Sequence, residues 1–117
     1  MDRTQYLFDG RLHGKNRLVL AVVQKYVFDH PGISAEKLMM VFDRSLQNPG
    51  TLGVVRILDD VKRSCSDYER RFFIKSGEVI KTSSKDCVVC TQWAAHYNIE
   101  KFLDKAKSLG YDIIPRP

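Results

Sequence analysis

The longest regular apolar pattern in the chain lies between Lys15 and Asp29. Apolar side chains recur there at spacings of three and four residues, which predicts a helix with one buried face. Because β-branched residues lower the intrinsic helix propensity, packing of that face has to stabilise the helix. The sequence His30-Pro31-Gly32 follows and ends it. The predicted face consists of Val19, Val22, Val23, Tyr26 and Val27.

The elements on either side of this helix carry local signals. Asp9-Gly10 separates residues 6–8 from residues 11–13, which predicts a short β-hairpin, because both turn residues need a positive φ. Ser34 is a good N-cap, since its hydroxyl can accept a hydrogen bond from a first-turn amide. It predicts a second helix over residues 35–42, followed by a turn at residues 47–50.

The next segment has two interpretations. The spacing of Val54, Ile57, Leu58 and Val61 favours a third helix over residues 52–64. The alternative is a strand at residues 53–55, where two valines follow a glycine.

The second half of the chain is richer in strand-forming residues. Two such runs, residues 71–74 and 78–81, flank a turn that contains glycine and predict a hairpin. Residues 87–93 predict a third strand, and residues 99–109 a last helix. Asn98 is a candidate N-cap for that helix, and Gly110 is expected in the left-handed conformation after it. Residues 112–114 predict an edge strand that Pro115 ends.

The predicted fold is therefore one α+β domain over residues 1–117, and the chain reads as a complete small protein. Its N-terminal half has three helices, and a small antiparallel sheet and a C-terminal helix follow. A chain of 117 residues buries about two thirds of its surface on folding, which is enough for a core without disulfides.

Three helices followed by a hairpin, over residues 15–81, resemble the order of elements in winged-helix domains. The same segment is also similar to small uncharacterised bacterial modules associated with mobile elements or restriction systems. The winged-helix resemblance implies that the third helix enters the major groove of DNA and that the hairpin at residues 70–81, as a wing, contacts phosphates or the minor groove.

The distribution of charge supports a nucleic-acid partner. The chain has 19 Lys and Arg residues against 14 Asp and Glu residues, a formal net charge of +5. The cations gather in residues 11–28 and 70–85, and such clusters are typical of proteins that bind the phosphate backbone. Asp59 and Asp60 in the expected third helix disfavour readout of bases. The predicted contacts are Arg11, Lys15, Arg17, Arg70, Arg71, Lys75 and Lys81.

Three other interpretations of these cations stay open. They could form an ordinary solvated surface. They could also be the basic face of a protein-interaction module, a homodimer included, that meets an acidic partner. A hydrolase or nuclease has the least support, because no set of carboxylates with a neighbouring lysine is visible. We therefore predict a binding protein, with no catalytic residues.

Three cysteines raise the question of a metal site. Cys87 and Cys90 have the spacing of a zinc knuckle, and Cys65 and His96 could complete it. The two valines between the cysteines favour a strand, in which positions i and i+3 point to opposite faces. We therefore predict no metal and no cofactor. Whether the four residues cluster is left open.

One segment near the end of the chain has an unusual composition. Gln92, Trp93, His96 and Tyr97 could line a pocket, since Trp and Tyr combine apolar area with a polar group. The alternative is that Trp93 anchors the last helix on the sheet. The longest apolar run is residues 18–23, too short for a membrane span or a signal peptide. Because an odd number of cysteines also fits a reducing compartment, we expect a cytoplasmic protein.

Overall fold

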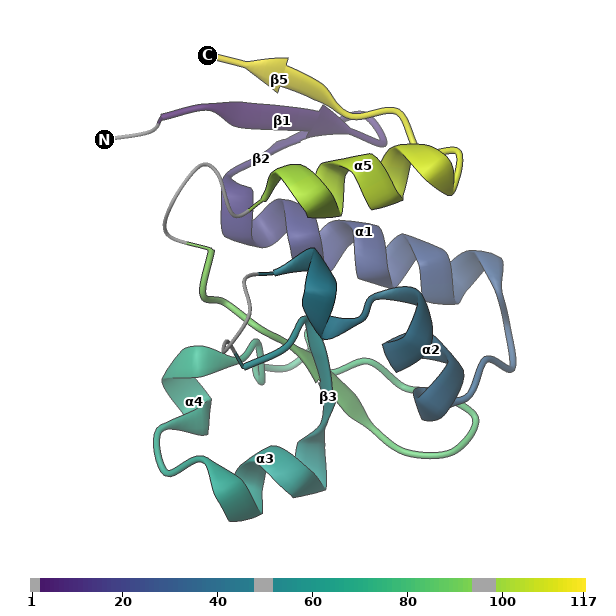
Figure 1. The fold of residues 1–117 in the computed structure, drawn as a ribbon, viewed down its shortest axis with the longest axis vertical. Coiled ribbons are helices and arrows are strands. Elements are labelled where there is room, and N and C mark those ends of the chain that lie inside the picture. Colours follow the sequence, from purple (N-terminus) through teal and green to yellow (C-terminus); the bar gives the residue numbers. More distant parts are fainter. Residues whose placement is uncertain (1–2, 48–51, 94–98) are drawn as a thin grey trace.

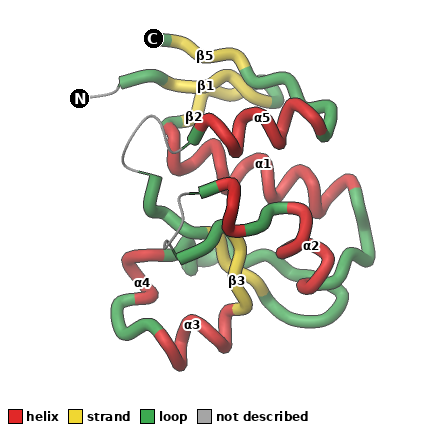
Figure 2. Tube along the Cα trace, viewed as in Figure 1, coloured by secondary structure: helices red, strands yellow, loops and turns green. Residues whose placement is uncertain are grey.

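The computed structural model describes residues 3–47, 52–93 and 99–117. Within these ranges the chain has an α+β fold with five α-helices and two small antiparallel sheets (Figure 1). A three-stranded sheet lies at one end of the molecule, and a two-stranded sheet lies toward the other end, with helices between and around them (Figure 2).

The three-stranded sheet joins the start of the chain to its end. Strands β1 (Gln5–Phe8) and β2 (Arg11–His13) form the expected hairpin. Its turn residues Asp9 and Gly10 have φ values of 52° and 82°, as this kind of turn requires.

The last strand differs from its prediction. Strand β5 (Ile114–Arg116) pairs with β1 in the order β2-β1-β5, two residues later in the chain than expected. Pro115 lies inside the strand, opposite Tyr6, instead of ending it. An edge strand tolerates proline because no neighbouring strand on its outer side needs a hydrogen bond from a backbone N–H group.

Helix α1 (Lys15–Asp29) confirms the predicted first helix and runs through the middle of the molecule (Figure 1). It contacts strands β1 and β2 of the three-stranded sheet and strand β4 (Cys87–Val89) of the two-stranded sheet. Burial on both sides leaves only a narrow strip of the helix open to solvent. The buried residues are Leu18, Val19, Leu20, Val22, Val23 and Tyr26.

The second helix is confirmed as well. Helix α2 (Ala35–Val41) begins after Ser34, whose hydroxyl accepts a hydrogen bond from the amide of Lys37 (3.1 Å). A short 3-10 helix, η1 (Arg44–Leu46), follows. Of the turn expected at residues 47–50, only Gln47 lies within the described residues.

The predicted third helix over residues 52–64 is wrong in its first half. Residues Val55–Ile57 form strand β3, and only Leu58–Ser64 form helix α3. A strand therefore does form in this segment, but at residues 55–57 and not at residues 53–55. Strand β3 pairs with β4 (Cys87–Val89), which consists of the first three residues of the strand expected at residues 87–93. The backbone of β4 needs a partner along this edge, and that long-range pairing overrides the local helical spacing.

The predicted hairpin between residues 71–74 and 78–81 is also wrong. Tyr68–Arg71 form helix α4, and the two runs do not pair with each other. Instead, Phe72 bridges to Cys90 and Ile80 bridges to Cys87. Both runs therefore form backbone bridges along the edge of β4 that does not pair with β3. With the third helix shortened and the wing replaced, the two elements that define a winged helix do not form as expected.

The last helix ends with the expected glycine. Helix α5 (Glu100–Ser108) is capped by Gly110, whose φ is +92°. The amide of Tyr111 donates to the carbonyl of Ala106 (3.1 Å), and the amide of Gly110 donates to that of Lys107 (3.0 Å). These two bonds make a Schellman motif. The candidate N-cap Asn98 lies outside the described residues.

Strand β4 separates two groups of buried side chains. Cys87 and Val89 point into the main core with α1, α2 and α5, whereas Val88 and Cys90 point into a smaller core. That smaller core also contains Val61 and Phe72. The alternation of side chains along an extended strand produces this division.

Gln47 joins several segments from a fully buried position. Its Nε2 donates to the carbonyl of Gln92 (3.1 Å) and lies 3.5 Å from the sulfur of Cys90. Its Oε1 accepts from the amide of Gly53 (3.2 Å). A buried amide is tolerated only when such partners satisfy it.

We predict that Gln47→Ala lowers the free energy of unfolding by about 2–4 kcal/mol, because the amide of Gly53 and the carbonyl of Gln92 lose their buried partner. The exposed Gln92 provides the matched control, and Gln92→Ala should change stability by less than about 0.5 kcal/mol. Urea unfolding of the three proteins tests this. Equal stabilities for the two variants would contradict the role given to Gln47.

Candidate nucleic-acid interface

The two basic segments of the sequence meet at one ion pair. The guanidinium of Arg17 on α1 lies 2.5 Å from Oε2 of Glu78, a residue 61 positions away in the chain. The same guanidinium lies 4.8 Å from the centre of the Phe73 ring. Arg17 thereby attaches the loop after Phe73 to the first helix and brings the two segments to the same side of the molecule.

Glu78 is a buried carboxylate whose partners keep it ionised. Burial raises its pKa, but Arg17 and the backbone amide of Lys75, which donates to Oε1 (3.0 Å), outweigh burial. The pKa of Glu78 is consequently lowered from its usual value of 4.5. Charge-assisted bonds of this kind are stronger than neutral ones.

Three neighbouring hollows follow the solvent-exposed strip of α1. The first has a volume of about 540 Å³ and lies between α1 and the β1–β2 hairpin. The second (about 330 Å³) and the third (about 350 Å³) continue past residues 76–78 toward α4. His13, Ala21 and Gln24 line both the first and the second, and Arg17 and Glu78 line both the second and the third. We call these three hollows together the α1 groove.

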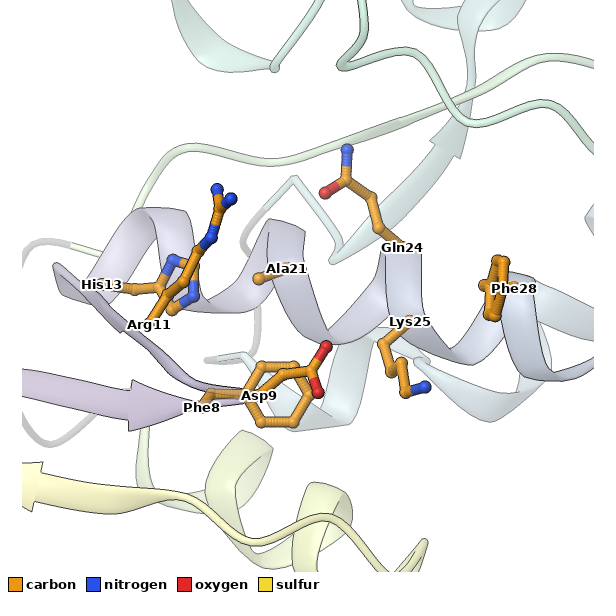
Figure 3. Close-up of a pocket in the computed structure, with 8 residues that line it drawn as sticks. All are labelled: Phe8, Asp9, Arg11, His13, Ala21, Gln24, Lys25 and Phe28. Carbon is orange, nitrogen blue, oxygen red and sulfur yellow. The ribbon is translucent and has the colours of Figure 1, made fainter.

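Figure 3 shows how the first hollow is built. Arg11 and His13 come from β2 and lie beside the start of α1, whereas Phe28 lies near the other end of the helix. Phe8 and Asp9 approach from the end of β1. The hollow thus has Arg11 toward one end and the Phe28 ring, with Lys25 beside it, toward the other.

Four of the seven predicted contact residues line the α1 groove. They are Arg11, Arg17, Arg70 and Lys75. Arg71 and Lys81 line none of its three hollows, and each forms an ion pair, Arg71 with Asp67 (2.7 Å) and Lys81 with Asp86 (2.8 Å). Lys15 begins α1 and is half-buried.

The cations of the groove differ in how they are paired. Arg17 is held by Glu78, and Arg70 by Asp67 at 2.8 Å. Arg11 and Lys75 are exposed, and neither side chain forms an ion pair with another described residue. These two are therefore the cations most available to an anionic ligand.

Several side chains of the groove are not among the contacts predicted from the sequence. Two of them are Lys25, which lies within the basic segment 11–28, and the aromatic residue Phe28. The signal that could have found Phe28 is its position, because it lies off the apolar face of α1 defined by Val19, Val23 and Tyr26.

The cysteines form no metal centre in the described residues. No three His, Cys, Asp or Glu side chains within residues 3–47, 52–93 and 99–117 lie close enough to hold an ion. Cys87 and Cys90 point into different cores, as the strand argument predicted, and His96 lies outside the described residues. Burial raises the pKa of Cys87 to about 11 and also raises that of Cys90, so both are thiols at neutral pH.

The predicted pocket near the end of the chain is only partly described. Trp93 is 1% exposed, its Nε1 donates to the carbonyl of Cys90 (3.0 Å), and its ring contacts that of Phe102 on α5. The indole therefore anchors the last helix. Gln92 is exposed, and His96 and Tyr97 lie outside the described residues.

Comparison with known proteins found no matching family model, no matching curated protein and no matching solved structure. Among the described helices, none is long and apolar enough to cross a bilayer.

We predict that Glu78 contributes stability that depends on pH. Because folding lowers its pKa, the contribution is complete above about pH 4.5 and is lost as the pH falls through the lower folded value. Wild-type protein should exceed Glu78→Gln in stability at pH 7 by more than at pH 3. Arg17→Gln and the double variant complete a double-mutant cycle, with a coupling of about 1 kcal/mol at pH 7. If the difference in unfolding free energy between wild type and Glu78→Gln is the same at pH 7 and pH 3, the ionised Glu78 does not contribute this stability.

Proposed function

We propose that the protein binds nucleic acid through the phosphate backbone, along the α1 groove. The observation that carries this proposal is the meeting of the two basic segments at Arg17 and Glu78. It connects Arg11 at one end with Arg70 and Lys75 at the other, so that the cations follow one continuous surface. A stripe of cations along a groove is the arrangement that tracks a backbone.

The paired arginines still have donors for phosphate. A guanidinium carries five N–H donors, and the side chain of Arg17 is 56% exposed although it is bonded to Glu78. The carboxylate fixes the orientation of the guanidinium before a ligand arrives, which reduces the entropy lost on binding. The negative charge of Glu78 also offsets part of the positive charge of the groove. We therefore expect moderate affinity, with Arg11 and Lys75 as the strongest contacts.

This proposal does not use base readout by α3. Asp60 on that helix is paired with Arg63, and no residue of α3 lines the α1 groove. The winged-helix mode of binding is not required either, since contact with the backbone needs only the groove. The protein is thus expected to bind with little sequence preference.

The test is a titration of labelled DNA, followed by fluorescence anisotropy, at about 50 and 200 mM salt. Affinity should fall with salt. The double variant Arg11→Gln/Lys75→Gln should bind more weakly, and the slope of log affinity against log salt should drop by about 0.7 per lost contact on a single strand. Each lost contact removes one set of released counterions, which is the physical origin of the slope.

A control with the same change in net charge is Lys62→Gln/Lys85→Gln. Both lysines are exposed, and neither lines the α1 groove. We expect wild-type binding from this variant. Equal loss in both double variants, or no binding at low salt, would refute the proposal. Competition by polyglutamate as strong, per charge, as by DNA would instead favour the acidic protein partner.

A further inference from the structure

Phe28 stands out among the apolar side chains of the described residues. It is 79% exposed, more than Met40 (71%), Leu12 (55%) or Ile114 (49%). A single exposed apolar residue is ordinary on a protein surface. Phe28 differs from this ordinary case because it lines the largest hollow of the α1 groove, together with cationic side chains.

Lys25 lies beside the Phe28 ring and is paired with Asp29. The ammonium of Lys25 lies 5.3 Å from the centre of the ring and 3.1 Å from a carboxylate oxygen of Asp29. The ammonium is thus held at one face of the ring by a cation–π contact and an ion pair. Most of the ring is still exposed, and a planar ligand in the hollow could stack on it beside the ammonium.

We propose that this hollow holds an unpaired base stacked on Phe28, so that the α1 groove takes single-stranded nucleic acid in preference to a duplex. The inference rests on the proposed function and names its ligand class. Proteins that bind single strands combine a cationic groove with aromatic platforms, since every base has a face that stacks. In a duplex the bases are already stacked on one another and cannot reach Phe28.

The dimensions and chemistry of the first hollow fit this ligand. Its volume of about 540 Å³ lies within the range of small-ligand sites. Between Phe28 and Arg17 the axis of α1 rises by about 16 Å, so a base on Phe28 leaves room for the strand to continue past Arg17. Arg11 and His13 lie at the far end of the hollow, where a neighbouring phosphate would pass (Figure 3).

Asp9 is the carboxylate of this hollow, and it would repel a phosphate placed directly beside it. Adenine, cytosine or guanine placed there presents an exocyclic amino group, which donates to a carboxylate. Gln24 adds an amide, of which Nε2 donates to the carbonyl of Gly77 (3.1 Å) and Oε1 is left to accept. The polar groups therefore suit a base in the hollow and phosphates toward the end that holds Arg11.

The experiment compares a short single strand with a duplex of the same length, at the same salt concentration. Wild-type protein should bind the single strand more tightly. Phe28→Ala should weaken binding of the single strand by about 5- to 150-fold, the usual effect of removing one stacking platform. Phe28→Trp should restore it, and none of these variants should change the salt slope, because no phosphate contact is lost.

Met40→Ala is the matched control, since Met40 is an exposed apolar residue on α2 that lines none of the three hollows. It should bind like wild type. A strand that carries 2-aminopurine reports stacking directly, and its fluorescence should be quenched by wild type but not by Phe28→Ala.

The outcomes separate the two proposals. Salt-dependent binding that is equal for single strand and duplex, and unchanged by Phe28→Ala, overturns the stacking site and leaves backbone binding standing. Absence of salt-dependent binding to either DNA overturns both. Thermal melting of Phe28→Ala confirms that the variant is folded, which its exposed position makes the expected result.

Discussion

The burial of strand β4 is the constraint on which the rest of the structure depends. All four residues from Cys87 to Cys90 have no exposed surface, so both edges of this backbone need hydrogen-bond partners within the protein. Strand β3 supplies one edge. The other edge is supplied by Phe73, whose amide donates to Val89 (2.9 Å), and by Ile80, which exchanges two bonds with Cys87 (2.8 Å each).

The α1 groove follows from this arrangement. Because Phe73 and Ile80 are both bound to β4, the chain between them has to leave the strand and return, and residues 74–79 project from it. Glu78 attaches this projection to Arg17 on α1. On its other side α1 meets the β1–β2 hairpin. The open strip of the helix thus lies between two walls, each carrying cations from a different part of the sequence.

The features that could be predicted from the sequence are those determined by neighbouring residues. The Asp9-Gly10 turn and the caps at Ser34 and Gly110 depend on short-range geometry, and the structure confirms all three. The third helix and the hairpin were wrong for one shared reason. Residues 55–57, 72–73 and 80 pair with β4, a partner distant in the chain, and local spacing does not report such pairing.

The same distinction applies to the candidate site. A count of cations places Arg17, Arg71 and Lys81 on equal terms, because sequence shows charge but not which carboxylate lies opposite. Folding commits Arg17 to Glu78 and leaves Arg11 and Lys75 available, so the effective charge of the groove is smaller than its residue content suggests. Counterion release alone then yields only modest affinity. A ligand that gains further free energy from an exposed ring therefore suits this groove better than one recognised by charge alone, and an unpaired base is such a ligand.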